Sequence, residues 1–283
     1  MPALNEGDED YTWLINFDPL RIDQYVNDES VQTINPTPSL YVEDTTTASS
    51  NGEGSTCFAG LRERVQKSTG KDLFGPQDKK TQSIALSTQL PYDRYYGIPE
   101  RESTLELRQT TNGDPYRLYA TDQPMHMPGN EQPLYGSVPY VTGFDMASAS
   151  AFLWVNSAHT FVDIDGQVIT FSSDSGALEF FTFSSTYNST SSNTNRVKKV
   201  NNDLATVSGY APMPMLQTLG FHFCKWANVS AEMLMQRNRD FTEYGFPLDV
   251  VWSDIEWAQQ NSTEGGYEYF KFNVQNFTQP QIA

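Results

Sequence analysis

The chain has 283 residues, which is enough for one large domain or two ordinary ones. Hydrophobic residues make up 38% of it and aromatic residues 13%, a composition that supports a packed core and argues against wholesale disorder. The formal net charge of −17 argues against nucleic acid and anionic membranes as partners, because both select surfaces rich in Lys and Arg.

Targeting and cross-linking signals are sparse. The first residues, MPALNEGDEDY, contain neither a basic nor an apolar stretch, so no signal peptide is expected there. No apolar run approaches the roughly 20 residues that span a bilayer, and two cysteines do not make a disulfide framework. Glycosylation sequons stand at Asn188, Asn228, Asn261 and Asn276. Chance supplies several sequons in a chain rich in Asn, Ser and Thr, so the compartment stays open.

The first 70 residues predict short strands followed by loops. The runs WLINF, LRIDQYV and SLYVE are apolar or alternating, and Asp-Pro and proline residues separate them. Residues 45–56 are polar and rich in Gly and Ser, which is typical of a surface loop or a flexible insertion. Residues 57–70 show little pattern, and no function is assigned to them.

Residues 71–200 are rich in predicted strands with frequent turns and little helix, which indicates an antiparallel β-sandwich. Asn112-Gly113 is a strong hairpin signal between two such runs. The polar stretch Tyr187–Lys199 predicts a solvated loop, and Val200–Pro214 a connecting segment that includes a short helix. The predicted strands are SIALSTQL, TLELRQTT, YRLYATD, YGSVPYVTGF, AFLWVNS, TFVDI, QVITFSS and ALEFFTFSS.

The segment after Pro212 predicts strand, helix, strand. Leu219–Phe223 is a short apolar run suited to a buried strand. Ser230 is the expected N-cap of the helix, with Glu232 in its first turn, where a carboxylate suits the helix dipole. Its apolar face and its stop signal are Leu234, Phe241, Tyr244, Gly245 and Pro247.

The second strand of this unit carries the polar residues of greatest interest. Leu248–Trp252 is apolar and β-branched, as expected for a buried parallel strand, and Ser253, Asp254 and Glu256 follow at its carboxyl end. In a βα barrel that end faces the active site. Two interpretations stay open: these carboxylates take part in chemistry, or they cap the next helix.

The pairing of LGFHFCKW with FPLDVVWSDIEW resembles the opening of the catalytic barrel in glycoside hydrolase family 31, the α-glucosidase family. YEYFKFNVQNF is similar to the segment that follows there. Four upstream segments fall in the family's order and are closest to its endoplasmic-reticulum members, which trim glucose from N-linked glycans. These segments are YYGIPE (95–100), LRQTTNGDPYRLYATD (107–122), PLYGSVPYV (133–141) and FLWVNSAHTFVDI (152–164).

The resemblance implies a fold and a function. Residues 1–207 would form an N-terminal antiparallel β-sandwich with polar insertions near 45–56 and 187–199. Residues 208–283 would begin a (β/α)8 TIM barrel with its first one or two βα units. The implied activity is that of a retaining α-glucosidase acting on terminal α-linked glucose, without a cofactor. The implied partners are an α-glucoside or glucosylated glycan and a lectin-like regulatory β-subunit, and the implied location is the lumen of the endoplasmic reticulum.

The resemblance also assigns substrate-binding residues. Asp254 would hydrogen-bond hydroxyls of the bound glucose, a task that suits a carboxylate because it accepts two protons at once. Asp122 would line the mouth of the site, unless it is an ordinary turn residue. Trp252 and Ile255 would form the pocket wall, although a buried core Trp is an equal alternative. His222 would end the first strand near the pocket floor, unless it is a satisfied core histidine. Glu256 is interpreted as structural.

Other chemistries have little support. His126, His159 and His222 are isolated and no cysteine cluster is present, so no metal site is expected. The sequence contains no Gly-rich phosphate loop and no Gly-x-Ser-x-Gly motif.

Several positions depart from the family pattern. Retaining glycosidases need two carboxyl groups about 5 Å apart, and the family motifs that supply them are not found, so we expect the isolated chain to be inactive. Arg101 and Glu102 stand where His-Ala is common, Lys225 replaces an Arg, and Lys271-Phe272-Asn273 replaces Thr-Trp-Asp. The alternative is a non-catalytic carbohydrate-binding or interaction protein derived from this family.

Overall fold

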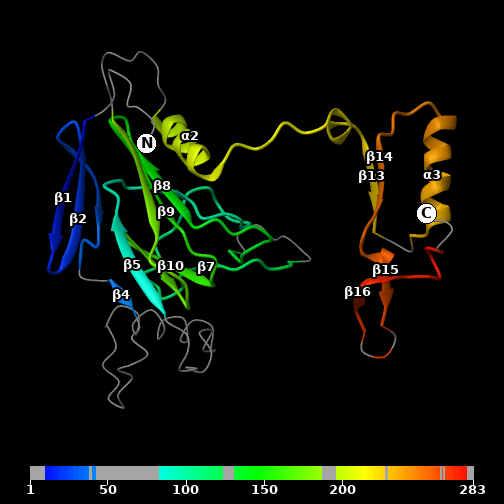
Figure 1. The fold of residues 1–283 in the computed structure, drawn as a ribbon, viewed down its shortest axis with the longest axis horizontal. Coiled ribbons are helices and arrows are strands. Elements are labelled where there is room, and N and C mark those ends of the chain that lie inside the picture. Colours follow the sequence, from blue (N-terminus) through cyan, green and yellow to red (C-terminus); the bar gives the residue numbers. More distant parts are fainter. Residues whose placement is uncertain are drawn as a thin grey trace. The chain divides into compact units, whose positions relative to one another are not determined.

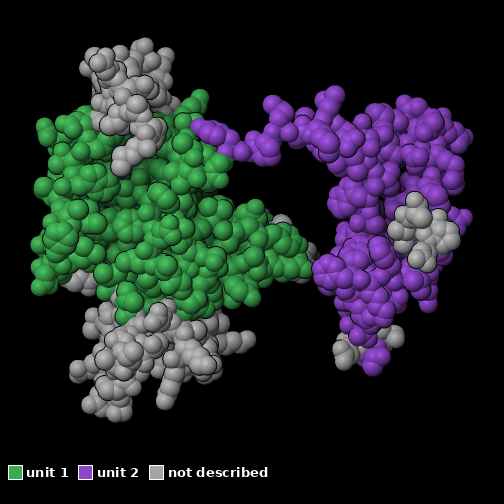
Figure 2. All heavy atoms as spheres, in the orientation of Figure 1, with its two compact units in different colours: residues 1–209 green, residues 210–283 purple. Residues whose placement is uncertain are grey.

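The computed structural model describes residues 10–37, 40–42, 83–123, 131–186, 196–226, 229–261, 263 and 265–278. The chain divides into two compact units, residues 1–209 and 210–283, and each is described by itself (Figure 2). The parts of the chain that lie outside the described residues include the predicted insertion at 45–56, the segment 57–70, Cys57, His126, and the sequons at Asn188 and Asn228.

Unit 1 is a sandwich of antiparallel sheets (Figure 1). An eight-stranded sheet has the order β1-β2-β3-β5-β11-β10-β7, with β4 paired to β5, and a four-stranded sheet has the order β12-β9-β8-β6. This architecture confirms the predicted fold class. The elements are β1 (Tyr11–Phe17), β2 (Leu20–Val26), β3 (Glu29–Ile34), β4 (Tyr41–Val42), β5 (Ile84–Gln89), β6 (Tyr95–Gly97), β7 (Tyr116–Leu118), β8 (Tyr140–Phe144), β9 (Ser148–Trp154), β10 (Thr160–Asp165), β11 (Val168–Ser173), β12 (Phe180–Thr186) and α2 (Arg196–Ser208).

The core of unit 1 lies between the two sheets. Phe152 of the smaller sheet packs at a tilt against Phe171 of the larger one, with ring centroids 5.3 Å apart, and both are fully buried. Burying a Phe side chain stabilises a fold by roughly 1.5–3 kcal/mol, so such pairs hold the sheets together. Polar contacts also join them, because Tyr11 Oη donates to the Ser184 carbonyl and Gln24 Nε2 donates to Ser184 Oγ, each at 2.9 Å.

Helix α2 covers the outer face of the smaller sheet. Val197, Val200 and Leu204 recur at helical spacing and pack against Ala149, Ala151 and Phe183. Residues 196–199 therefore belong to a helix, and the prediction of a solvated loop as far as Lys199 is wrong for them. Arg196, Lys198 and Lys199 make this stretch polar on average, so the apolar stripe that α2 buries was not recognised in the sequence.

Two further local predictions fail in unit 1. Asn112-Gly113 lies in a turn, closed by the Gly113 N–H donating to the Thr110 carbonyl at 2.9 Å, but the preceding run forms no strand. The strand after it, β7, pairs with β10 instead. The turn signal was correct and the hairpin was not, because pairing was decided by distant residues. Strand β3, which links β2 to β5, was not singled out in the sequence.

Unit 2 contains the expected βα unit. Strands β13 and β14 pair in parallel, with α3 between them in the chain, which is the start of a TIM-barrel arrangement. The elements are η1 (Leu216–Leu219), β13 (His222–Lys225), α3 (Ala231–Glu243), β14 (Val250–Ser253), η2 (Ile255–Trp257), β15 (Ala258–Gln260) and β16 (Tyr267–Phe272). The first strand thus begins three residues later than Leu219, which itself lies in a 3-10 turn.

Helix α3 has the ends that the sequence predicts. Ser230 has an extended backbone, and its side chain accepts a hydrogen bond from Met233 N at 3.2 Å, while Glu232 occupies the first turn. Phe241 packs its ring against Phe223 of β13 at 5.8 Å. Tyr244, expected on the same face, is exposed at the C-cap. Among the described residues, no helix combines the length and apolar content needed to cross a bilayer.

Candidate functional site

The register of β13 and β14 defines the two faces of this strand pair. Cys224 lies opposite Trp252 and Lys225 opposite Ser253, and side chains alternate between faces along each strand. Because Phe223 contacts α3, the face that carries Cys224 and Trp252 points away from the helix. In a TIM barrel the helices lie outside, so this is the face that would turn toward the barrel interior.

Asp254 follows the carboxyl end of β14 directly. Its Oδ1 accepts a hydrogen bond from the Ile255 backbone N–H at 2.7 Å, which caps the 3-10 turn η2. The capping interpretation is therefore correct for one carboxylate oxygen. Among the described residues Oδ2 has no partner, so the other oxygen remains available to a hydroxyl group. The two interpretations of Asp254 are compatible.

The neighbours of Asp254 differ in exposure. The Trp252 side chain is 48% exposed, and both interpretations of it, pocket wall or buried core residue, stay predictions. Ile255 is half-buried in η2. Glu256 is 7% exposed, which agrees with a structural role, although its Oε2 has no hydrogen-bond partner among the described residues. Burial raises the pKa of the Cys224 thiol, and the negative charges of Asp254 and Glu256 raise it further.

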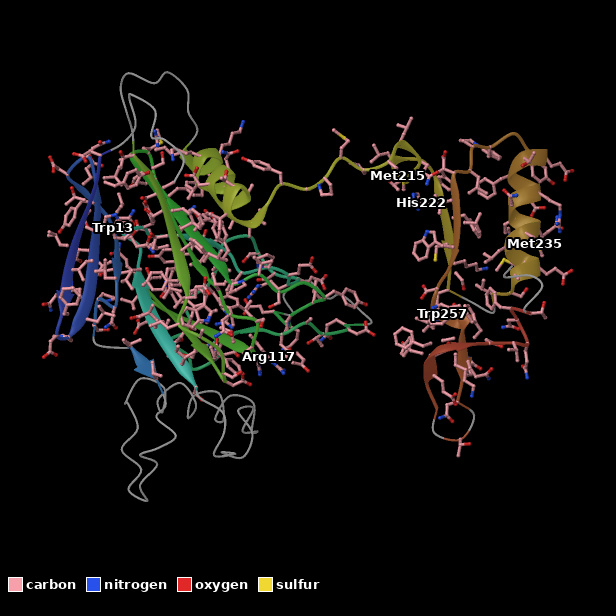
Figure 3. All side chains as sticks on the ribbon, in the orientation of Figure 1. Trp13, Arg117, Met215, His222, Met235 and Trp257 are labelled. Carbon is pink, nitrogen blue, oxygen red and sulfur yellow. The ribbon has the colours of Figure 1, made fainter. Side chains whose placement is uncertain are left out.

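His222 does not lie where the sequence placed it. It is the first residue of β13, not its end, and its ring nitrogen lies 3.1 Å from the Thr218 carbonyl. Figure 3 shows His222 and Trp257 at opposite ends of the strand pair. Three residues of strand separate His222 from Lys225, or about 10 Å at roughly 3.3 Å per residue. The expectation that His222 ends the strand is wrong, because the apolar run LGFHF precedes most of the strand, and its place near the pocket floor stays a prediction.

Asp122 lies in unit 1, in the loop after β7. Tyr135 Oη donates a hydrogen bond to Asp122 Oδ1 at 2.5 Å, and both side chains are exposed. Tyr135 lies 13 residues further along the same connection between β7 and β8. Asp122 belongs to unit 1 and Asp254 to unit 2.

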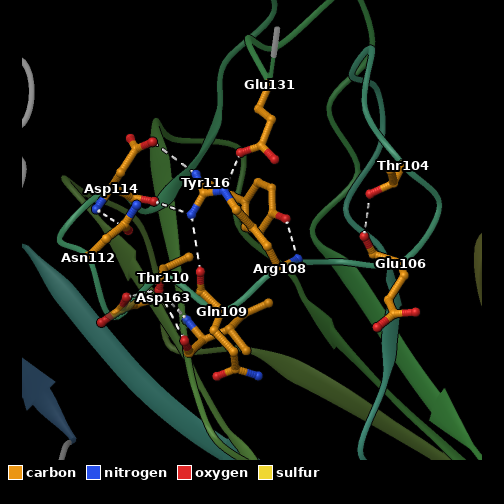
Figure 4. Close-up of polar contacts among 11 residues, drawn as sticks. Thr104, Glu106, Arg108, Gln109, Thr110, Asn112, Asp114, Tyr116, Glu131 and Asp163 are labelled. Carbon is orange, nitrogen blue, oxygen red and sulfur yellow. Dashed lines mark hydrogen bonds and ion pairs between the residues drawn. The ribbon is translucent and has the colours of Figure 1, made fainter. Parts of the chain in front are cut away.

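Arg108 organises the segment that leads to β7 (Figure 4). Its guanidinium donates to Glu131, to the Asp114 carboxylate and to the Asp114 carbonyl, and the last two distances are both 2.9 Å. Its backbone N–H donates to Tyr116 Oη at 2.7 Å, and its guanidinium lies 5.0 Å from the centre of that ring. One side chain thereby ties Asp114, just before β7, to Glu131 in the connection between β7 and β8 that carries Asp122 and Tyr135.

His159 belongs to a cation–aromatic cluster at the edge of the larger sheet, where Figure 3 labels Arg117 on β7. Arg117 Nε donates to His159 Nε2 at 2.9 Å, and the guanidinium lies 4.6 Å from the centre of the Tyr119 ring. Burial, and then the Arg117 charge, lower the pKa of His159 to about 4. In the described part of the chain, no three His, Cys, Asp or Glu side chains are grouped so as to hold a metal ion.

Each of the two units contains a match to a known protein family domain. Residues 3–163 match the Glycosyl hydrolase 31 N-terminal galactose mutarotase-like domain, and residues 211–283 match the Glycosyl hydrolases family 31 TIM-barrel domain. The chain belongs to glycoside hydrolase family 31. Both family domains agree with the sandwich and with the βα unit described above.

Similar family 31 proteins are α-glucosidases. The glucosidase 2 subunit alpha of Schizosaccharomyces pombe is 27% identical over 229 residues, covering 75% of this chain and 23% of the relative. Neutral alpha-glucosidase AB of Dictyostelium discoideum is 32% identical over 197 residues, covering 65% and 19%. A crystal structure of glucosidase II alpha subunit superposes with a TM-score of 0.72 at 24% identity, covering 95% of this chain and 29% of that one, which shows the shared fold. The chain thus spans less than a third of each.

Sequence reasoning missed Tyr135 and Cys224 as neighbours of the candidate residues. Tyr135 stands in the segment PLYGSVPYV that carries the family resemblance, which was the available signal. Cys224 follows from strand alternation once the start of β13 is known.

Proposed function

We propose that this chain forms the N-terminal sandwich and the first barrel unit of a retaining α-glucosidase that hydrolyses terminal α-linked glucose. One observation carries the proposal. Asp254 stands at the carboxyl end of a parallel strand of family 31, with one carboxylate oxygen fixed by its own cap and the other without a partner in the described residues. Barrel enzymes bind their substrates at that edge.

The proposed roles follow from the chemistry of each group. Asp254 accepts hydroxyl protons of the glucose unit in charge-assisted hydrogen bonds. Trp252 offers an exposed planar face on which a sugar ring can stack, and Ile255 adds an apolar wall beside it. Asp122 contributes a second carboxylate from the sandwich loop. His222 is left out of the site, because it begins β13 at the far edge.

The covalent chemistry is assigned to residues other than these. A retaining mechanism uses one carboxylate as nucleophile and one as acid and base, about 5 Å apart. The resemblance assigns Asp254 to binding, and the family motifs for the catalytic pair are not found in these 283 residues. We therefore expect these 283 residues alone not to hydrolyse an α-glucoside.

A regulatory partner is part of the same proposal. One similar crystal structure, with a TM-score of 0.70 at 24% identity, is described as an ER glucosidase II heterodimeric complex of catalytic subunit and the binding domain of regulatory subunit. We propose a glucosylated glycan as substrate, a regulatory subunit as partner and the endoplasmic reticulum as compartment, supported by this likeness and by the upstream motifs.

The test compares Asp254→Asn with Asp240→Asn in the whole enzyme of which these residues are proposed to form part. Asp240 is a matched carboxylate on α3, bound to Arg237. We expect kcat/KM for a chromogenic α-glucoside to fall by about 10- to 100-fold for Asp254→Asn, and to stay unchanged for the control. Equal activity of the two variants would remove Asp254 from the site. Glucose binding without any hydrolysis by the whole protein would support the carbohydrate-binding alternative.

A further inference from the structure

Three segments that carry the family resemblance meet at one place in unit 1. The Thr121 N–H donates to the Leu134 carbonyl at 2.8 Å, and the Leu134 N–H donates to the Glu100 carbonyl at 2.9 Å. The Glu100 N–H in turn donates to the Gly136 carbonyl at 2.8 Å. Backbone hydrogen bonds therefore hold the segments YATD, PLYGS and IPE side by side.

A side chain reinforces this arrangement next to Tyr135. Glu100 Oε2 accepts a hydrogen bond from the Gly136 N–H at 2.8 Å. A Cβ atom on Gly136 would lie 2.5 Å from the Glu100 carboxyl carbon, so only glycine fits without moving that carboxylate. Residues on both sides of Tyr135 are thus anchored, which reduces the conformational freedom that its side chain loses on binding Asp122.

An exposed hydrogen bond normally competes with water and contributes little. The Tyr135 side chain is 63% exposed, yet its hydroxyl lies 2.5 Å from Asp122 Oδ1. Asp122 Oδ2 has no partner among the described residues. The tyrosine hydroxyl therefore fixes the rotation of the carboxylate and leaves one oxygen for another donor.

We propose that Tyr135 is a positioning residue, which orients the Asp122 carboxylate toward a hydroxyl group of the bound sugar. This inference rests on the proposed function and adds to it a residue that never touches substrate. Holding a binding group in its productive geometry before substrate arrives lowers the barrier, because the entropy of orientation has already been lost.

The test is a double-mutant cycle in the whole enzyme, with a chromogenic α-glucoside as probe. The variants are Tyr135→Phe, which removes only the hydroxyl, Asp122→Asn, and both together. Tyr119→Phe is the matched control, since Tyr119 is an exposed tyrosine of the same loop whose hydroxyl makes no hydrogen bond in the described residues. Thermal unfolding of each variant separates a loss of stability from a loss of activity.

We expect Tyr135→Phe to lower kcat/KM by about tenfold with an unchanged melting temperature, as for loss of a hydrogen bond to a charged group. In the Asp122→Asn background the same change should alter kcat/KM by less than about twofold, because the carboxylate that the hydroxyl orients is gone. Tyr119→Phe should match the wild type.

Two results would overturn the inference while the proposed function stands. The first is a kcat/KM of Tyr135→Phe equal to that of Tyr119→Phe. The second is independent, multiplicative effects of Tyr135→Phe and Asp122→Asn on kcat/KM. A wild-type enzyme that neither hydrolyses the glucoside nor binds an iminosugar analogue of glucose would overturn both together. If Asp122→Asn is too slow to assay, calorimetric binding of the same iminosugar completes the cycle, with the same non-additivity expected.

Discussion

The Nε–H of Arg117 donates a hydrogen bond to Nε2 of His159 across 2.9 Å, so that ring nitrogen must be unprotonated in the folded protein. A proton on it would remove the acceptor and set two positive charges side by side. Burial and the Arg117 charge hold the pKa of His159 at about 4, below the ordinary 6.5.

This contact predicts a loss of stability in acid. Between pH 6.5 and 4 the unfolded chain binds a proton at His159 that the folded chain does not, so stability falls as the pH falls through this range. Each pKa unit corresponds to about 1.4 kcal/mol, and partial solvation of the ring reduces the effect to about 1–2 kcal/mol. His159→Gln keeps an acceptor for Arg117 and should flatten the pH dependence of urea unfolding by that amount relative to the wild type. Identical slopes for the two proteins would contradict the prediction.

Arg108 should not tolerate lysine. Lys cannot reproduce the fork that reaches Glu131 and Asp114 together, so Arg108→Lys should lower the free energy of unfolding of unit 1 by about 1–2 kcal/mol. Arg94→Lys is the control, because the Arg94–Glu106 pair is long, at 3.6 Å, and well exposed. Its effect should stay below about 0.5 kcal/mol. Urea unfolding followed by circular dichroism measures both variants, and equal losses would show that the fork is not what matters.

Replacing Arg101 by methionine should increase the stability of unit 1. Its Nε and Nη2 are buried and have no hydrogen-bond partner in the part of the chain that the structure describes, and burial lowers the pKa of this guanidinium to about 10. The main compensation is the Tyr116 ring, 4.5 Å away. Arg101→Met keeps an apolar stem of similar length and removes the desolvated charge, so we expect a gain of about 1 kcal/mol in thermal or urea unfolding. The exposed Arg94→Met should be neutral. A loss of stability in Arg101→Met alone would mean that the ring contact outweighs desolvation.

Ser230 should stabilise α3 through its cap. Ser230→Ala removes the acceptor of the Met233 N–H and should cost about 1 kcal/mol in the unfolding of unit 2. Thr242→Ala is the control on the same helix. Its hydroxyl only bonds back to the Asn238 carbonyl, so alanine should be neutral or slightly favourable there. A Ser230→Ala variant as stable as wild type would indicate that water replaces the cap.

Features with local causes were predictable from the sequence. The cap at Ser230, the helix behind it and the position of Asp254 after an apolar strand depend on neighbours within a few residues. The start of β13 was not predictable, because it depends on Asp249, whose carboxylate accepts from Phe221 N at 2.8 Å and whose N–H donates to the Phe221 carbonyl. That contact spans 28 residues and sets the register in which His222 begins the strand.

The two candidate carboxylates, Asp254 and Asp122, differ in how far the sequence predicts their surroundings. Asp254 could be recognised from its own strand and motif. The contact between Asp122 and Tyr135 could not be predicted, because it depends on backbone hydrogen bonds among three segments, at Thr121, Leu134 and Glu100. Alternation and turn signals describe each segment, but they do not say which segments become neighbours.

The contact between Tyr11 and Ser184 has a consequence for biosynthesis. The two residues are 173 positions apart, so the sandwich cannot close until β12 has emerged from the ribosome. Before β12 is available, the β1 residues Trp13, Leu14 and Phe17 are exposed, as they still are in the folded unit. Folds with such high contact order are slow to complete, and apolar strand edges that wait during translation are substrates for chaperones. Strands β1 and β2 can pair early as a local hairpin, but the contact of this hairpin with β12 forms only after nearly the whole sandwich has been synthesised.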